Sequence, residues 1–224
     1  MLRVAVDAMG GDYAPAEVIK GALGAVRRRE DLHILLVGSA GAIQKNIGHK
    51  LNFPRIKVIH TDEVIANDED PGLAVFSKRK SSLITAMQLV RDGKADAVLS
   101  AGNTGALMGG GLLFLERISG IRRPALLTVI PSFEGNGTVL LDIGANMDAK
   151  PEHLCHYALM GRIYAREVLK KKHPRVALLN VGSEENKGNA QVKNAYKLIR
   201  ESVPGFIGNV EAIDIFRNKA DVLV

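Results

Sequence analysis

Short apolar runs alternate with segments of helical periodicity along most of this 224-residue chain, and the alternation limits the folds open to it. Strands separated by helices pair in parallel, so the pattern predicts an α/β fold with a mostly parallel sheet flanked by helices. We expect residues 1–224 to form a single domain of this class. The runs typical of such strands are Leu2–Ala8, His33–Val37, Arg55–His60, Ala97–Leu99, Arg175–Val181 and Ala220–Val224. Helices are expected after Pro15, around Ile43–Ile47, after Ser82, after Gly105, from Pro151 to about Lys172 and from Asn189 to about Ser202.

One pair of strands breaks this alternation. Pro124–Ile130 and Thr138–Ile143 are separated only by the short loop Pro131–Gly137. That loop cannot hold a crossover helix, so the pair should form an antiparallel hairpin inserted in the parallel sheet.

A second exception is Thr61–Lys80, which carries five acidic residues and no clean period. We expect a long excursion over the surface, and ordered loops of this length are often functional. Ser81 or Ser82 should cap the helix that follows.

Composition limits the classes of partner and compartment that we expect. A net charge of +6 makes an acidic partner plausible: a phosphorylated ligand, an acidic carrier protein or an anionic bilayer. Diffuse surface charge is the alternative. Aromatic residues make up 4% and Trp is absent, which argues against a nucleic-acid surface built on base stacking. The single Cys155 allows no internal disulfide, so we expect a cytoplasmic protein.

The stretch Asp96–Ala106 is the focal point of the sequence. Ala97–Leu99 is typical of a buried strand, and Ser100–Gly105 then opens a helix. A Gly-rich loop between a strand and a helix N-terminus can bind an anion, because backbone N–H groups and the helix dipole point the same way. It can equally be a tight βα turn in which Ser or Asn serves as a cap.

Four expected strand ends carry polar, Gly-rich turns. Ligands of parallel α/β sheets collect at the carboxyl ends of the strands, so four such turns at one edge would indicate a binding site. The turns are Asp7–Asp12, Ser100–Gly105, Asp142–Asn146 and Gly182–Asn189.

Common catalytic motifs are missing. The sequence has no phosphate loop, no G-x-G-x-x-G after the first strand, no G-x-S-x-G and no H-E-x-x-H. Cys155 lies on an apolar helix face and reads as a core residue. With no evident nucleophile in the chain, a bound phosphate could itself attack an activated carbonyl while the protein positions it. Lys80, Lys150 and Lys187 are candidate cations or solvated lysines, and His153 is a general acid–base or a helix cap.

Six segments together resemble the bacterial phosphate acyltransferases of the PlsX family, in order along the whole chain. They are DAMGGD (7–12), Lys80–Ser82, SAGNTGA (100–106), LDIGAN (141–146), KPEH (150–153) and NVGSEENKGN (180–189). The resemblance implies a fold similar to the isocitrate/isopropylmalate dehydrogenase and phosphate acetyltransferase group. It implies conversion of acyl-[acyl carrier protein] and inorganic phosphate to acyl-phosphate and free carrier, for phospholipid synthesis.

The resemblance also implies a cytoplasmic homodimer that contacts the membrane peripherally and hands its product to a membrane glycerol-3-phosphate acyltransferase. It implies no metal, no nucleotide cofactor and no nucleic acid. Carried over by motif, the expected catalytic residues are Lys187, Asn103 and His153. The expected phosphate- and substrate-binding residues are Asp7, Gly10, Gly11, Asp12, Lys80, Ser81, Ser82, Ser100, Gly102, Thr104, Gly105, Asp142, Gly144, Asn146, Lys150 and Glu184. The thioester is expected to enter along the helix that holds Gly109–Gly111.

Two departures from the family pattern shape the remaining hypotheses. Family members continue past the position of Val224, so we expect a C-terminally truncated chain, and Ala66–Phe76 fits the pattern loosely. The alternatives to the acyltransferase are an NAD(P)-dependent dehydrogenase of the related fold and an inactive fragment.

Overall fold

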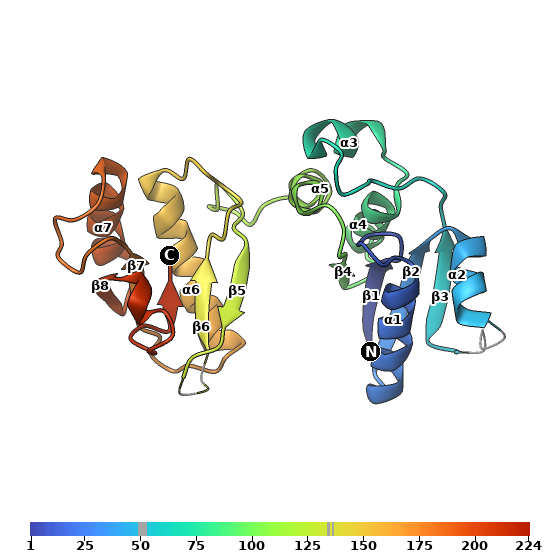
Figure 1. The fold of residues 1–224 in the computed structure, drawn as a ribbon, viewed down its shortest axis with the longest axis horizontal. Helices are drawn as coiled ribbons and strands as arrows, with labels where there is room; N and C mark the ends of the chain where they lie inside the picture. The colour runs from blue at the N-terminus through green and yellow to red at the C-terminus, as the bar shows by residue number, and fades with distance from the viewer. Residues whose placement is uncertain (49–52, 134, 136) are drawn as a thin grey trace. The chain divides into compact units, whose positions relative to one another are not determined.

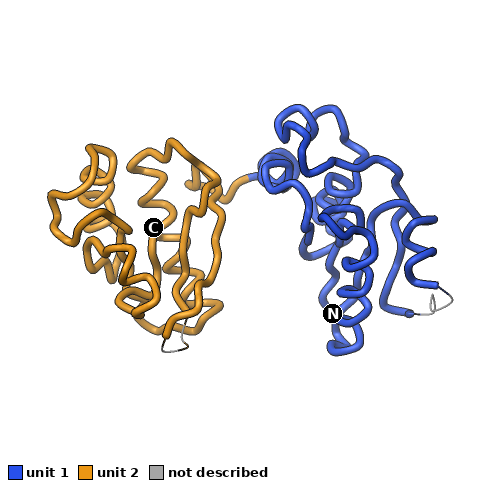
Figure 2. The backbone as a smooth tube through the Cα atoms, in the orientation of Figure 1, with its two compact units in different colours: residues 1–116 blue, residues 117–224 orange. Residues whose placement is uncertain are grey.

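The computed structural model describes residues 1–48, 53–133, 135 and 137–224. The chain divides into two compact units, residues 1–116 and 117–224 (Figure 2). Each unit contains its own sheet and core.

Unit 1 is built on a parallel sheet of four strands. Their order is β3 (Ile56–His60), β2 (Leu32–Gly38), β1 (Leu2–Asp7) and β4 (Ala97–Leu99). Successive residues of a strand face opposite sides, so Val6 packs with α1 (Ala16–Arg28) and α2 (Ala40–Ile47). Ala5 packs on the other side with α4 (Ser82–Arg91). Helices therefore cover both faces of the sheet, as predicted (Figure 1).

The strand β4 differs from its prediction. Ala97 and Leu99 are exposed, and the side chain of Leu99 is 59% accessible. The expectation of a buried strand is wrong because β4 pairs only with β1 among the described strands and lies at the edge of its sheet.

The excursion Thr61–Lys80 contains a helix that the sequence did not suggest, α3 (Pro71–Ser77). Asp70 caps it by accepting the Leu73 N–H at 2.8 Å, and Pro71 occupies the first helical position. Seven residues are too few to show a helical period, although an Asp-Pro pair is a helix-start signal.

Of the three glycines at 109–111, close packing explains Gly110. A Cβ there would lie 2.6 Å from the Met87 Sδ of α4. The helix α5 (Thr104–Gly110) ends at this contact and continues as one π-helical turn, Gly111–Leu115.

Unit 2 holds a five-stranded sheet. The order is β5 (Leu127–Ile130), β6 (Thr138–Leu141), β9 (Val222–Leu223), β7 (Val176–Leu179) and β8 (Phe206–Val210). Among the described strands of this sheet only β5 and β6 pair antiparallel, which confirms the predicted hairpin. Residues 134 and 136 of its loop lie outside the described residues.

Two helices and a short turn complete unit 2: α6 (Pro151–Glu167), α7 (Ala190–Ser202) and the 3₁₀ turn Ala212–Asp214. The helix α6 ends five residues before the predicted Lys172. Tyr157, Ile199 and Val222 are fully buried in the core, and Cys155 is buried there as expected.

The four polar turns end strands of two sheets. Asp7–Asp12 and Ser100–Gly105 follow β1 and β4 of unit 1, whereas Asp142–Asn146 and Gly182–Asn189 follow β6 and β7 of unit 2. The prediction of one shared edge is therefore wrong, because β4 and β6 belong to separate hydrogen-bonded sheets.

Candidate functional site

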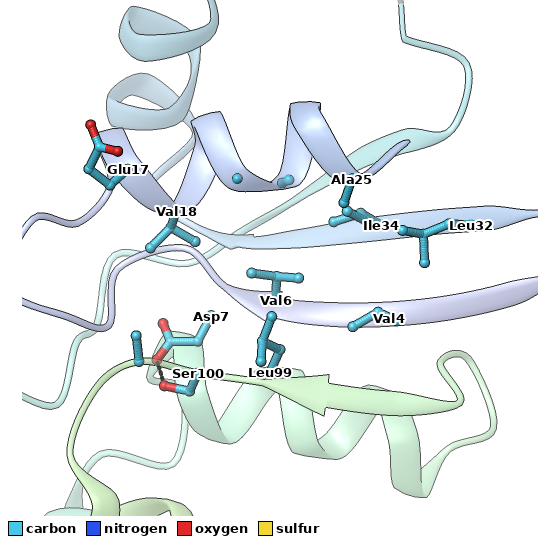
Figure 3. Close-up of a pocket in the computed structure, with 13 residues that line it drawn as sticks. Val4, Val6, Asp7, Glu17, Val18, Ala25, Leu32, Ile34, Leu99 and Ser100 are labelled. Atoms are coloured by element: carbon cyan, nitrogen blue, oxygen red, sulfur yellow. Dashed lines mark hydrogen bonds between the residues drawn. The ribbon is translucent and has the colours of Figure 1, made fainter. Parts of the chain in front are cut away.

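The end of β1 is joined to the end of β4 by a pair of side chains. The Asp7 carboxylate is buried, and its Oδ2 accepts a hydrogen bond from Ser100 Oγ at 2.8 Å (Figure 3). Its Oδ1 accepts the Met9 N–H at 3.2 Å, and Ser100 Oγ accepts the Gly102 N–H at 3.1 Å. The parallel pairing of β1 with β4 thus places residues 93 positions apart in direct contact.

Glycine is required where the two turns meet. A Cβ on Gly10 would lie 2.4 Å from Asp7 Oδ2 and 2.8 Å from Ser100 Oγ, and a Cβ on Gly102 would lie 3.1 Å from Gly10 Cα. Gly11 has a φ of +114°, which L side chains rarely adopt, and stands against Ala101. These contacts are closer than a side chain permits, so both turns depend on glycine for their packing.

Asn103 links the turn after β4 to the excursion after β3 by hydrogen bonds. Its Nδ2 donates to the carbonyls of Ala66, Asn67 and Glu69 at 3.0–3.3 Å. Its Oδ1 accepts the Ala106 N–H at 2.9 Å and caps α5. Both the nitrogen and the oxygen of the Asn103 amide therefore make structural hydrogen bonds. This agrees with the interpretation of Asn103 as a helix cap and weighs against a direct catalytic role.

The other predicted residues near these two turns of unit 1 are exposed. Thr104 and Gly105 are exposed at the start of α5, with Gly105 against Pro71. Asp12 is exposed, and its Oδ1 accepts from Asn67 Nδ2 at 3.0 Å. The excursion after β3 thereby contacts both turns.

The Lys80–Ser82 segment begins α4. The Lys80 side chain is exposed, and its backbone N–H donates to Glu63 Oε2 at 2.9 Å. Ser81 and Ser82 are buried: Ser81 caps α4 by accepting the Ile84 N–H at 3.5 Å. Ser82 Oγ has no hydrogen-bond partner among the described residues.

In unit 2 the carboxylate of Asp142 organises its own turn. Oδ1 accepts the N–H groups of Leu126 and Ala145 at 3.0 Å each. Oδ2 accepts the backbone N–H of Asn146 at 2.8 Å and the Asn146 side-chain amide at 2.7 Å. Gly144, with a φ of +108°, lets the chain turn back toward this carboxylate.

His153 lies at the first turn of α6. Its Nδ1 accepts the Lys150 backbone N–H at 3.3 Å, so it caps the helix, while the Lys150 side chain is exposed. Burial first, and then the charge of Arg123, lower the pKa of His153 below its usual value. Tyr157, one turn along the same helix, has a fully buried hydroxyl whose pKa is raised to about 12 by burial and by Asp142.

The turn after β7 is more open. Lys187 Nζ lies 3.7 Å from Glu184 Oε1, and both side chains are about half exposed. Asn209 of β8 donates from Nδ2 to the Glu184 carbonyl at 2.7 Å and so fixes the turn. Lys187 is therefore a half-exposed cation on a turn that Asn209 anchors.

Sequence reasoning missed three residues of these clusters. Asn67 had no local signal, because its partners Asp12 and Asn103 are distant in sequence. Tyr157 could have been found, because it lies four residues after His153 and residues four apart share one face of a helix. Arg123 became evident only through its proximity to His153 and Tyr157.

Two other kinds of site are absent from the described ranges. No group of three or more His, Cys, Asp or Glu side chains there could hold a metal ion. Among the helices of the described part of the chain, none is both long enough and apolar enough to cross a bilayer.

The fold and these turns define a class of α/β protein in which parallel sheets carry polar, Gly-dependent turns at the carboxyl ends of their strands. The solved structures agree: EutD phosphotransacetylase from Staphylococcus aureus matches the whole chain and 77% of its own length, at a TM-score of 0.67 and 17% identity. A 4-hydroxythreonine-4-phosphate dehydrogenase from Burkholderia phymatum matches at a TM-score of 0.57 and 15% identity, with 100% of this chain and 79% of that one covered. At such identities these likenesses show the fold alone.

The family model described as "Fatty acid synthesis protein" matches residues 2–224, and the chain belongs to this family. A relative from Listeria innocua named "Phosphate acyltransferase" is 50% identical over 224 residues, which are 100% of this chain. The chain spans 66% of the length of that relative.

Proposed function

We propose that this protein transfers an acyl group from an acyl-[acyl carrier protein] thioester to inorganic phosphate, in the service of phospholipid synthesis. The observation that carries the proposal is the pair formed by buried Asp7 and half-buried Ser100, which holds the two Gly-dependent turns together beside the exposed Thr104 and Gly105. A phosphate at these turns would meet a preorganised polar surface. The family and the relatives named above support the acyl chemistry.

The only cysteine is a poor nucleophile, which favours the bound phosphate in that role. Cys155 is buried, and burial raises the pKa of its thiol. An oxygen of hydrogen phosphate would attack the thioester carbonyl, forming a C–O bond while the C–S bond breaks. The proton of hydrogen phosphate would end on the carrier thiol, so acyl-phosphate and free carrier are the products.

The residues of unit 2 enter the proposal as separately testable assignments. Lys187 is half exposed, so its ammonium could contact an anion. His153 has a lowered pKa, which favours the neutral imidazole, and its Nε2 is the nitrogen not engaged in capping. A homodimer, peripheral membrane contact and hand-over to a membrane acyltransferase remain predictions from the family resemblance.

The test incubates the protein with acyl-[acyl carrier protein] and phosphate, and traps acyl-phosphate with hydroxylamine. Free carrier and hydroxamate should appear together, and Ser100→Ala should raise the KM for phosphate while Ser202→Ala, at the exposed end of α7, does not. Lys187→Ala should lower kcat at unchanged Tm, because an exposed ion pair contributes little to stability, with the exposed Lys193→Ala as control.

Three results would overturn parts of the proposal. Absence of carrier release would overturn the activity of this chain. Stabilisation by phosphate without turnover would instead support the inactive-fragment hypothesis. Saturable binding of NADH by calorimetry, without carrier release, would favour the dehydrogenase.

A further inference from the structure

Residues 117–122, at the start of unit 2, form a pocket of about 530 Å³ together with His156 of α6. The backbone turns there through Gly120, whose φ is +84°, and the Ile121 N–H donates to the Ile118 carbonyl at 3.0 Å. None of the residues that line this pocket is among the expected phosphate- and substrate-binding residues. The proposed function therefore leaves the pocket unexplained.

The polar side chains of this pocket are cationic or neutral. Arg117 and Arg122 contribute two guanidinium groups, His156 contributes an imidazole and Ser119 a hydroxyl. Among the described residues that line the pocket, none is acidic. The lining thus carries two positive charges that no carboxylate of the pocket compensates.

Both arginines also lack an acidic partner elsewhere in the described part of the chain. Other exposed arginines pair with carboxylates at 2.7–2.8 Å, as Arg3, Arg166 and Arg200 do. Arg117 Nη1 instead donates to the backbone carbonyl of Arg122 at 2.9 Å, which orients its guanidinium. A guanidinium without a carboxylate partner presents several N–H donors in the fixed geometry that binds carboxylates and phosphates.

The imidazole and the charges around it favour an anion as well. His156 Nδ1 is buried and has no hydrogen-bond partner among the described residues, so no bond at that nitrogen holds the ring away from a ligand. Burial and then Arg123 lower the pKa of the neighbouring His153. Glu152 opposes this shift, whereas Lys150 and His156 add to it. Positive charge therefore prevails next to the pocket, and a bound anion would compensate it.

We propose that this pocket binds a phosphate monoester, with the phosphate on Arg117 and Arg122 and the organic part against Ile118 and Ile121. A phosphate monoester carries a charge of about −1.5 to −2 at pH 7, which matches two guanidiniums, whereas a carboxylate would compensate only one. Ile118 is 76% exposed and Ile121 is half-buried, so both can contact a ligand. The volume lies within the roughly 300–1,000 Å³ typical of small-ligand pockets and exceeds what a phosphate ion fills.

The test measures binding of 4′-phosphopantetheine, a soluble phosphate monoester, by calorimetry. Pantetheine, which lacks only the phosphate, should bind at least tenfold more weakly. Arg122→Gln should weaken binding of the phosphate ester at least tenfold, and Arg122→Lys should recover part of the loss. Lys193→Gln removes the same charge from the exposed surface of α7 and should change binding less than twofold, which separates a site from diffuse charge. The Arg122 side chain has no ion pair in the described part of the chain, so the Tm of Arg122→Gln should equal that of the wild type.

A second measurement distinguishes a soluble ester from a lipid headgroup. Vesicles of phosphatidylcholine with phosphatidic acid carry the same phosphate monoester, and vesicles of phosphatidylcholine alone do not. Sedimentation with the first kind alone, abolished by Arg122→Gln, would support the site with a lipid as its ligand. Calorimetric binding of 4′-phosphopantetheine without sedimentation would support it with a soluble ester.

Three results would overturn the inference. They are absence of binding to both esters, equal weakening by Arg122→Gln and Lys193→Gln, and an affinity for inorganic phosphate as high as for the esters. The readout is binding that depends on Arg122, so a failure to form acyl-phosphate would remove the proposed function and leave this inference standing.

Discussion

Asp7 and Asp142 each lie at the end of a strand and begin a Gly-containing turn, yet their carboxylates make different kinds of contact. Asp142 accepts four N–H bonds, all from residues within 16 positions of it. Asp7 accepts one local N–H and one hydroxyl from Ser100, 93 residues away. The first carboxylate closes its own loop, whereas the second joins the turns that follow two neighbouring parallel strands.

The contrast shows which turn can take on a further ligand. A carboxylate surrounded by four donors has its acceptor positions filled, and its charge is already compensated. The Asp7 turn instead uses few bonds and close glycine packing, and it lies beside exposed residues. We therefore place the phosphate proposal at the turn of unit 1, and treat the Asp142 turn as a structural element of unit 2.

The largest expected effect is that of Asp142→Ala on the stability of unit 2. Removing the carboxylate leaves four N–H groups without their acceptor, and we expect the free energy of unfolding to fall by about 4 kcal/mol. Denaturant unfolding measures this, and hydrogen exchange should localise the loss to residues 124–146. The exposed Asp148→Ala is the control. A loss under about 1 kcal/mol, the net value of one ordinary hydrogen bond, would remove the contrast between the two aspartates.

Gly10→Ala should be next in size. Its Cβ would lie 2.4 Å from Asp7 Oδ2, so the turns must separate, at a cost of about 3 kcal/mol. Gly21→Ala, whose Cβ meets nothing within 4 Å, should instead be neutral or stabilise α1 by up to about 1 kcal/mol. Thermal melts of the two variants test the pair. Equal Tm values would show that the close packing at Gly10 is not what holds the turns together.

Asn103→Ala tests whether the Asn103 amide has a structural or a catalytic role. Loss of the α5 cap and of three carbonyl contacts should lower stability by about 2 kcal/mol. Asn103→Asp keeps an acceptor for the Ala106 N–H but loses the amide donor, so its Tm should still fall. A large loss of turnover at wild-type Tm in both variants would contradict the structural role and restore the catalytic one.

The smallest effect concerns pH and the cap of α6. The folded state favours neutral His153, because burial and Arg123 lower its pKa, so protonation favours the unfolded chain. Stability should therefore decline as pH falls through the unfolded-state value of about 6.5 and level off below the lowered pKa. Unfolding free energies measured from pH 8 to pH 5 should show a shallower slope for His153→Gln. The exposed His173→Gln should keep the wild-type slope, and an unchanged slope in His153→Gln would exclude this titration.

The sequence by itself determined the elements whose signals are local. Alternating apolar runs gave the strands, and the short loop before Thr138 gave the hairpin. The sequence also offered two cap candidates at each helix start, Ser81 or Ser82 and Ser or Asn, of which Ser81 and Asn103 are the caps. The six motif segments determined the family in the same way, because each is a contiguous string of residues.

The tertiary structure alone decided how these elements meet. It divided the four turns between two sheets, exposed β4 as an edge, and brought Asp7 to Ser100 and Asn67 to Asn103. It also left an apolar groove that is lined by α1 and by strands β1, β2 and β4. Such contacts join residues tens of positions apart, and a local pattern of residues carries no information about which distant partner a strand or side chain will find.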